Sequence, residues 1–172
     1  MTRPAEALLA LCVARGISVA VAESLTGGLL AAELVQIPGA SAVFRGGVVS
    51  YATELKASVL GVDAALLSRE GPVHAEVARQ MAAGVQEWAS IDGSPARLGL
   101  ATTGVAGPGA QEGVPAGTVF VAAALDGDVR VCGLFLSGDR DAVRRASVAA
   151  ALRLAVELVG DGSGSESAGG AP

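Results

Sequence analysis

Apolar and polar positions along the chain group into alternating helical and strand-like runs, which is the pattern of an α/β domain. Residues 17–22 form an apolar run of strand length, broken only by Ser18, which predicts a buried strand, and residues 98–102 predict a second strand. Gly16 and Pro38 end the two helical runs that flank the first of these strands. The pattern predicts helices over residues 4–15, 26–37, 63–69, 74–89 and 139–159, a helix capped by Thr53, and strands over 46–51, 117–125 and 129–136.

A short hairpin is predicted at Asp126-Gly127-Asp128, between the last two strand runs. A hairpin pairs its strands antiparallel, so the predicted sheet is mixed rather than purely parallel. The length of 172 residues corresponds to a single domain, which we place at residues 1–159. Residues 160–172 are rich in Gly, Ser and Ala, and we expect them to form a disordered tail.

Composition narrows the class of protein. The 12 basic and 17 acidic residues leave a net charge of −5, which disfavours binding to nucleic acid or to an anionic membrane surface. No apolar run approaches the roughly 18 residues that cross a bilayer. The 35 alanines and 24 glycines, with only 3% aromatic residues, predict a core that packs closely. Cys12 and Cys132 are isolated and have no metal-ligand spacing, which favours a reducing cytoplasm and no metal site or cofactor.

The turn after the first strand is the first candidate site, because ligands bind at the carboxyl edge of α/β sheets. There Ser24 is followed by Thr26, Gly27 and Gly28, at the start of a helix. Backbone N–H groups freed by the glycines are able to stabilise an oxyanion or a phosphate. The alternative is that Ser24 or Thr26 only caps the helix and the glycines relieve crowding.

Positive charge in this chain is carried by 11 arginines and a single lysine, Lys56. Arginine does not release its proton near neutral pH, whereas a partly buried lysine does, so Lys56 is a candidate general base for a serine hydroxyl. Tyr51, the single tyrosine, is a candidate donor to the same site. The alternatives are a solvated lysine and a half-buried tyrosine at the sheet edge.

A glycine-rich loop follows the strand at residues 98–102 and is the third candidate. Thr103, Gly104 and Gly107 fall in this loop, and their hydroxyl and backbone groups suit an anion or a ribose phosphate. A plain tight turn is the alternative. We interpret His74, the single histidine, as a helix cap or surface residue, and the arginines near residue 140 as the solvated face of a helix from which one is able to reach a phosphate.

Taken together, these segments resemble the CinA family, specifically its C-terminal domain, which also exists alone as the PncC-type nicotinamide-nucleotide amidase. The resemblance covers roughly residues 5–158, and its motifs occur in the family's order. The matching segments are Ala22-Glu23-Ser24-Leu25-Thr26-Gly27-Gly28, Phe44-Arg45-Gly46-Gly47-Val48-Val49-Ser50-Tyr51, Lys56, Leu60-Gly61-Val62, Thr103-Gly104-Val105-Ala106-Gly107-Pro108, Pro115-Ala116-Gly117-Thr118-Val119 and Gly138-Asp139-Arg140.

The resemblance implies a three-layer α/β/α sandwich with a mixed, mostly parallel sheet that contains one antiparallel hairpin. It also implies hydrolysis of nicotinamide mononucleotide to nicotinic acid mononucleotide and ammonia, in pyridine-nucleotide recycling, and a homodimer or higher homo-oligomer. With it, we expect Ser24 to be the nucleophile, Lys56 the base and Tyr51 an orienting or protonating residue. Backbone N–H groups at residues 25–28 would hold the oxyanion. The expected substrate-binding residues are Thr26, Gly27, Gly28, Arg45, Thr103, Gly104 and Gly107.

Two departures from the family pattern bear on substrate affinity. The family's Gly-Ala-Val-Ser segment reads Gly71-Pro72-Val73-His74 here, and Val114 stands where a lysine is usual. The loss of a cation predicts weaker phosphate binding. The chain offers no residues for the molybdopterin-binding-like domain of longer members, so we expect no pyrophosphatase activity. Two alternatives stay open: a non-catalytic module that binds a nucleotide or phosphate, and an amidase with another substrate.

Overall fold

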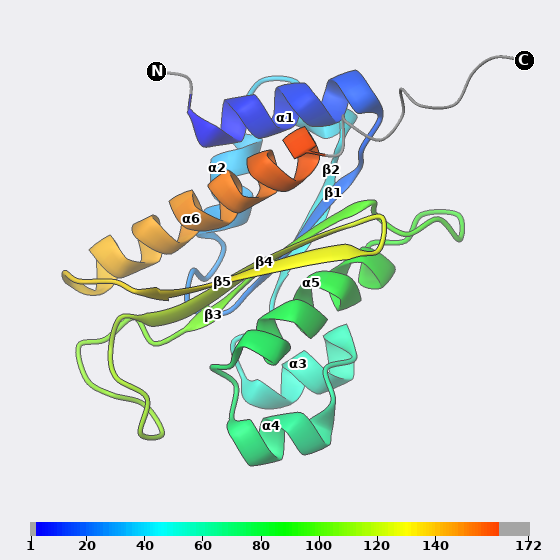
Figure 1. Ribbon diagram of the computed structural model, residues 1–172. Coiled ribbons are helices and arrows are strands. Elements are labelled where there is room, and N and C mark those ends of the chain that lie inside the picture. Colours follow the sequence, from blue (N-terminus) through cyan, green and yellow to red (C-terminus); the bar gives the residue numbers. More distant parts are fainter. Residues whose placement is uncertain (1–2, 162–172) are drawn as a thin grey trace, which may run out of the picture.

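The computed structural model describes residues 3–161, which form a sheet with helices on both of its faces (Figure 1). Gly16 ends the first helix in the left-handed conformation, with φ of 60°, as the sequence predicts. In chain order the elements are α1 (Pro4–Arg15), β1 (Val19–Glu23), α2 (Leu29–Val35), a short 3₁₀ helix (Ala40–Ala42), β2 (Phe44–Val49), α3 (Thr53–Leu60), α4 (Ala64–Glu70), α5 (Ala75–Trp88), β3 (Leu98–Gly104), β4 (Thr118–Leu125), β5 (Asp128–Phe135) and α6 (Arg140–Asp161).

The described strands form one five-stranded sheet in the order β2-β1-β3-β4-β5. β1 pairs parallel with both β2 and β3, whereas β4 is antiparallel to β3 and to β5. The mixed sheet is therefore confirmed, but parallel and antiparallel pairings are equal in number rather than mostly parallel. β3 and β4 are joined by a loop with no helix, whereas a parallel pairing usually has a helical crossover.

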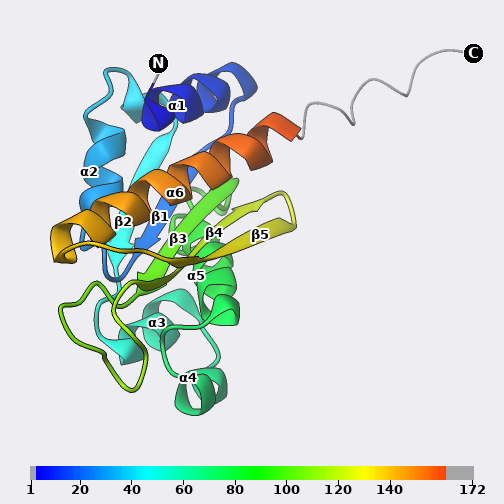
Figure 2. The ribbon, with the colours of Figure 1, turned by 60° about the vertical axis from the view of Figure 1, so that its left-hand side comes forward.

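The helices divide into two layers, as the three-layer sandwich requires. α1, α2 and α6 cover one face of the sheet, and α3, α4 and α5 cover the other (Figure 2). Each face has its own apolar core, and β1 contributes to both because its side chains alternate between them. Within the described residues, no helix is long and apolar enough to cross a membrane.

Small residues let the helices and strands approach closely, both within a layer and between layers, as the alanine and glycine content predicts. A Cβ added at Gly84 of α5 would lie 1.9 Å from the Leu60 carbonyl oxygen, at the end of α3. A Cβ added at Gly99 of β3 would lie 2.0 Å from the Ala82 carbonyl oxygen. Backbone therefore packs directly against backbone at both positions, and a larger residue there would push the elements apart.

Most element bounds agree with the sequence to within two residues, and the differences have local causes. α2 begins at Leu29 rather than at Thr26, because residues 24–28 form a turn before the helix. Ala52, not Thr53, is the N-cap of α3, and it makes no side-chain cap hydrogen bond. α6 continues to Asp161, so it includes the first two residues of the predicted tail, while the rest of that tail lies outside the described residues.

Candidate active site

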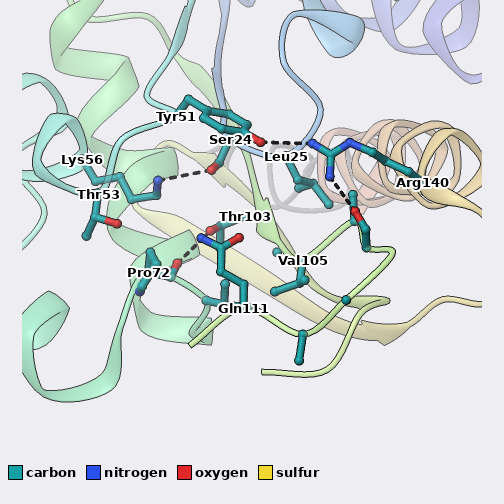
Figure 3. Close-up of a pocket in the computed structure, with 16 residues that line it drawn as sticks. Ser24, Leu25, Tyr51, Thr53, Lys56, Pro72, Thr103, Val105, Gln111 and Arg140 are labelled. Carbon is teal, nitrogen blue, oxygen red and sulfur yellow. Dashed lines mark hydrogen bonds between the residues drawn. The ribbon is translucent and has the colours of Figure 1, made fainter. Parts of the chain in front are cut away.

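A cavity of about 280 Å³ opens at the carboxyl ends of β1 and β3, the edge at which the sequence places its candidate residues (Figure 3). Five segments far apart in the chain line it: the turn after β1, the β2–α3 junction, the α4–α5 loop, the β3–β4 loop and the start of α6. Its size is close to the lower limit of pockets that bind small molecules. The residues from the sequence analysis that line it are Ser24, Tyr51, Lys56, Thr103, Gly104 and Gly107.

The centre of this cavity is a contact between Ser24 and Lys56. The Lys56 side chain is only 1% exposed, and its Nζ lies 3.2 Å from Ser24 Oγ and 2.7 Å from the Ser50 carbonyl oxygen. Burial lowers the pKa of Lys56 from 10.5 to about 8, while the charge of Glu54 opposes this shift. A substantial fraction of Lys56 is thus neutral near pH 8, and a neutral amine is able to take the proton of a serine hydroxyl.

Glu23 ends β1 and satisfies the first backbone N–H groups of α2. Its buried carboxylate accepts hydrogen bonds from the N–H groups of Gly28, Leu30 and Ala31, at 2.9–3.0 Å. The Gly27 N–H donates to the carbonyl oxygen of Ser24. The glycine amides are therefore engaged inside the protein, and neither Gly27 nor Gly28 lines the cavity. Gly27 and Gly28 were expected to contact the oxyanion and the substrate, but the structure does not place their amides at the cavity.

Arg144 of α6 holds the same turn from the other side. Its Nε donates to the Leu25 carbonyl oxygen at 3.0 Å, and its Nη2 donates to the Thr26 carbonyl oxygen at 2.8 Å. In the described chain, the N–H groups of Leu25 and Thr26 are the ones in this turn that have no acceptor. Leu25 follows Ser24 directly and lines the cavity, so its N–H is the amide best placed to receive an oxyanion.

Tyr51 and Arg140 form the rim on the α6 side. Arg140 Nη2 donates to the Tyr51 hydroxyl at 3.1 Å, and Nη1 donates to the Gly107 carbonyl oxygen at 2.7 Å (Figure 3). Tyr51 is 60% exposed, so its ring forms an edge of the opening rather than its floor. The sequence places Arg140 on the solvated face of a helix, from which one of the arginines near residue 140 is able to reach a phosphate, and the structure has Arg140 lining the cavity.

The β3–β4 loop supplies the opposite wall. Thr103 is buried, and its hydroxyl donates to the Pro72 carbonyl oxygen at 2.7 Å, so this hydroxyl remains available to a ligand only as an acceptor. Gln111, which sequence reasoning missed, also lines the cavity. Val114, at the position of the missing lysine, pairs with Gln111 in a short turn and is not a lining residue.

Several expected site residues lie elsewhere. Arg45 donates to the carbonyl oxygens of Ala89 and Ser94, behind β2, and does not line the cavity. The Thr26 hydroxyl is buried 2.8 Å from that of Thr102. His74 caps α5, since its Nδ1 accepts the Glu76 N–H, and its predicted structural role is confirmed.

The fold and the site define a three-layer α/β protein that has a buried serine–lysine pair at the carboxyl edge of its sheet. The family model of the CinA C-terminal domain matches residues 1–159. The chain therefore belongs to the CinA family. A CinA-like protein of Frankia casuarinae is 51% identical over 86% of this chain. A putative competence-damage inducible protein of Halothermothrix orenii is 43% identical over 74% of it.

Solved structures agree with this assignment. A CinA superfamily protein from Klebsiella pneumoniae superposes with a TM-score of 0.86 at 31% identity, over 92% of this chain and 96% of that one. A competence/damage inducible protein from Agrobacterium tumefaciens gives a TM-score of 0.82 at 33% identity, with the same coverage. The matched region spans about a third of the length of the two curated relatives, 33% and 30% respectively.

Proposed function

We propose that this chain is a serine amidohydrolase that converts nicotinamide mononucleotide to nicotinic acid mononucleotide and ammonia. The observation that carries the proposal is the buried Lys56 amine, 3.2 Å from the Ser24 hydroxyl, in a cavity open to a ligand. Burial that keeps a fraction of this lysine neutral is what a base for serine requires, and a surface lysine would stay protonated.

Acylation begins when Ser24 Oγ attacks the carboxamide carbon and its proton moves to Lys56 Nζ. The carbonyl oxygen becomes an oxyanion, which the Leu25 N–H stabilises. The tetrahedral intermediate collapses as the lysine ammonium returns the proton to the leaving nitrogen, and ammonia departs. Water then attacks the acyl ester with neutral Lys56 as its base, which releases the carboxylate and restores Ser24.

The charge of the cavity favours an anionic substrate. Its 16 lining residues include two basic side chains, the cationic Arg140 and the partly protonated Lys56, and no carboxylate. Arg140 is held in place by Tyr51 and Gly107, so its guanidinium is fixed at the rim before a ligand arrives. A phosphate monoester bound by Arg140 would lie in the same cavity as Ser24. The glycine-rich β3–β4 loop adds backbone contacts on the same side.

Ammonia release from nicotinamide mononucleotide tests the proposal. Ser24→Ala should lower turnover by at least about 10³-fold, because it removes the hydroxyl that is paired with Lys56. Lys56→Arg should be comparably inactive, since arginine keeps its proton. Ser58→Ala is the matched control, because Ser58 is an exposed serine on α3 whose hydroxyl only donates to the Glu54 carbonyl oxygen.

The same assay separates the alternatives. Turnover near the wild-type rate in Ser24→Ala would remove serine catalysis, and activity retained in Lys56→Arg would mean that charge rather than proton transfer matters. Tight nucleotide binding without ammonia release would favour the non-catalytic module. Release of ammonia from other amides alone would favour an amidase with a different substrate.

A further inference from the structure

Ser50 lies beside Ser24 across the β1–β2 ladder. The registered pairs Ala22↔Val48 and Glu23↔Val49 lead to Ser24 and Ser50 as the next positions, and the Ser50 N–H continues the ladder by donating to the Glu23 carbonyl oxygen. Ala22 and Val48 both belong to the core under α3 and α5, so the two serine side chains face that layer as well. Neighbouring strands are about 5 Å apart, which makes these side chains direct neighbours.

The Ser50 hydroxyl is buried and has no hydrogen-bond partner in the described structure. The carbonyl oxygen of Ser50 accepts a hydrogen bond from Lys56 Nζ at 2.7 Å, so the lysine amine already contacts Ser50. A buried hydroxyl without a partner weakens the folded state, and such groups are rare. Its place next to the Ser24–Lys56 pair points to a role that arises only when the lysine changes its protonation state.

We propose that Ser50 is a positioning residue whose hydroxyl accepts the third hydrogen bond of Lys56 when acylation turns the amine into an ammonium. This inference rests on the proposed function. A neutral amine has two N–H groups, and the proton taken from Ser24 gives it a third. The three N–H groups of the ammonium then donate to the Ser50 carbonyl oxygen, to Ser24 Oγ and to Ser50 Oγ. The charge formed in the buried site is therefore fully hydrogen-bonded. When the proton leaves with ammonia, the hydroxyl is again without a partner.

Other charged groups near Lys56 are unchanged by a substitution at Ser50. Glu54, on the same helix, acts on the lysine through its charge. Tyr51 and Arg140 line the same cavity and are bonded to each other. Because these groups remain in place, a change in Lys56 titration in a Ser50 variant reports on the hydroxyl.

The test is Ser50→Ala, read by NMR on protein labelled with ¹³Cε-lysine. Lys56 is the single lysine of the chain, so one signal reports its titration directly and without substrate. Loss of an acceptor destabilises the ammonium, so the pKa of Lys56 should fall by roughly 0.5–1 unit below the wild-type value. With nicotinamide mononucleotide, kcat should fall about ten-fold at unchanged KM, while resistance to urea should not decrease. Ser50→Thr, which keeps a hydroxyl, should restore the titration.

Thr118→Val is the matched control, because Thr118 is the other buried hydroxyl without a partner among the described residues. It should leave both the titration and turnover as in the wild type. An unchanged or raised pKa of Lys56 in Ser50→Ala would overturn the inference. The titration keeps this outcome apart from a failure of the proposed function, because it needs no turnover. If Ser24→Ala still releases ammonia near the wild-type rate, the proposed serine mechanism fails whatever the titration shows.

Discussion

Replacing Lys56 by methionine should abolish catalysis and yet stabilise the folded protein near neutral pH. The lysine is 1% exposed, and burial lowers its pKa from 10.5 to about 8. The unfolded chain thus binds this proton more tightly than the folded chain does. At about 1.4 kcal/mol per pKa unit, keeping the ammonium buried costs the folded state about 3 kcal/mol at pH 7. Methionine has a similar length and carries no charge.

Part of this gain is offset by the hydrogen bond that the lysine makes. Without Nζ, the Ser50 carbonyl oxygen loses its 2.7 Å donor, which costs about 1 kcal/mol. The expected net stabilisation of Lys56→Met is therefore about 2 kcal/mol at pH 7. The sign follows from linkage: the unfolded state binds more protons between pH 8 and 10.5, so wild-type stability from this group rises with pH across that window.

Urea denaturation of both proteins, at about pH 7 and about pH 9.5, measures the effect. The advantage of Lys56→Met should shrink by about 2 kcal/mol between the two conditions, because the wild-type lysine is neutral in the folded state at the higher pH. Comparing the two proteins at each pH removes the contribution of every other titrating group. A variant that is less stable than the wild type near pH 7, or an advantage that does not change with pH, would refute the reasoning.

Four further outcomes follow from the same structure. In an ammonia-release assay, kcat/KM should rise with pH and level off above the pKa of Lys56, about 8, because only the neutral amine is a base; a flat profile would contradict this. Glu23→Gln should lower the unfolding free energy by about 2 kcal/mol in urea, since an amide cannot replace a carboxylate that accepts three N–H groups; a loss under about 0.5 kcal/mol would contradict it. Arg144→Met should reduce kcat at least about ten-fold by releasing the turn that carries Ser24, the proposed nucleophile, whereas Arg145→Met, which breaks an exposed ion pair with Asp141, should not. Gly84→Ala should destabilise the protein by about 2 kcal/mol in a urea titration, against the helix propensity of alanine, because the added Cβ would meet a carbonyl oxygen at 1.9 Å; a gain in stability would show that α3 and α5 separate freely.

The sequence predicted the Ser24–Lys56 pair better than its surroundings, for a physical reason. Lys56 stands out because it is the single lysine among eleven arginines, and Ser24 because it follows a buried strand. Both signals are local. Arg140 and Arg144 act on turns more than thirty positions away, at Gly107 and at Leu25, and only the packing of α6 across the sheet brings them there. No spacing in the sequence encodes those contacts.

The prediction for the glycine amides illustrates a different limit. Glycines at the start of a helix are typical of an anion site, and this pattern predicts such a role for Gly27 and Gly28. The signal against it was Glu23, an acid at the end of an otherwise apolar strand. Its carboxylate is itself the anion at the start of α2. Sequence patterns locate backbone N–H donors well, but they do not show which acceptor in the same chain those N–H groups are hydrogen-bonded to.

This internal carboxylate has a consequence for how the proposed substrate is held. With Glu23 at the N-terminus of α2, a phosphate placed there would face a buried negative charge and no free amide, so the helix end is closed to it. The favourable location for a phosphate is the opposite rim, where Arg140 stands with the β3–β4 loop. The Leu25 N–H then remains for the smaller, transient charge of the oxyanion. In the proposed reaction the two anions would therefore lie apart, with the permanent phosphate charge by Arg140 and the transient oxyanion beside Ser24.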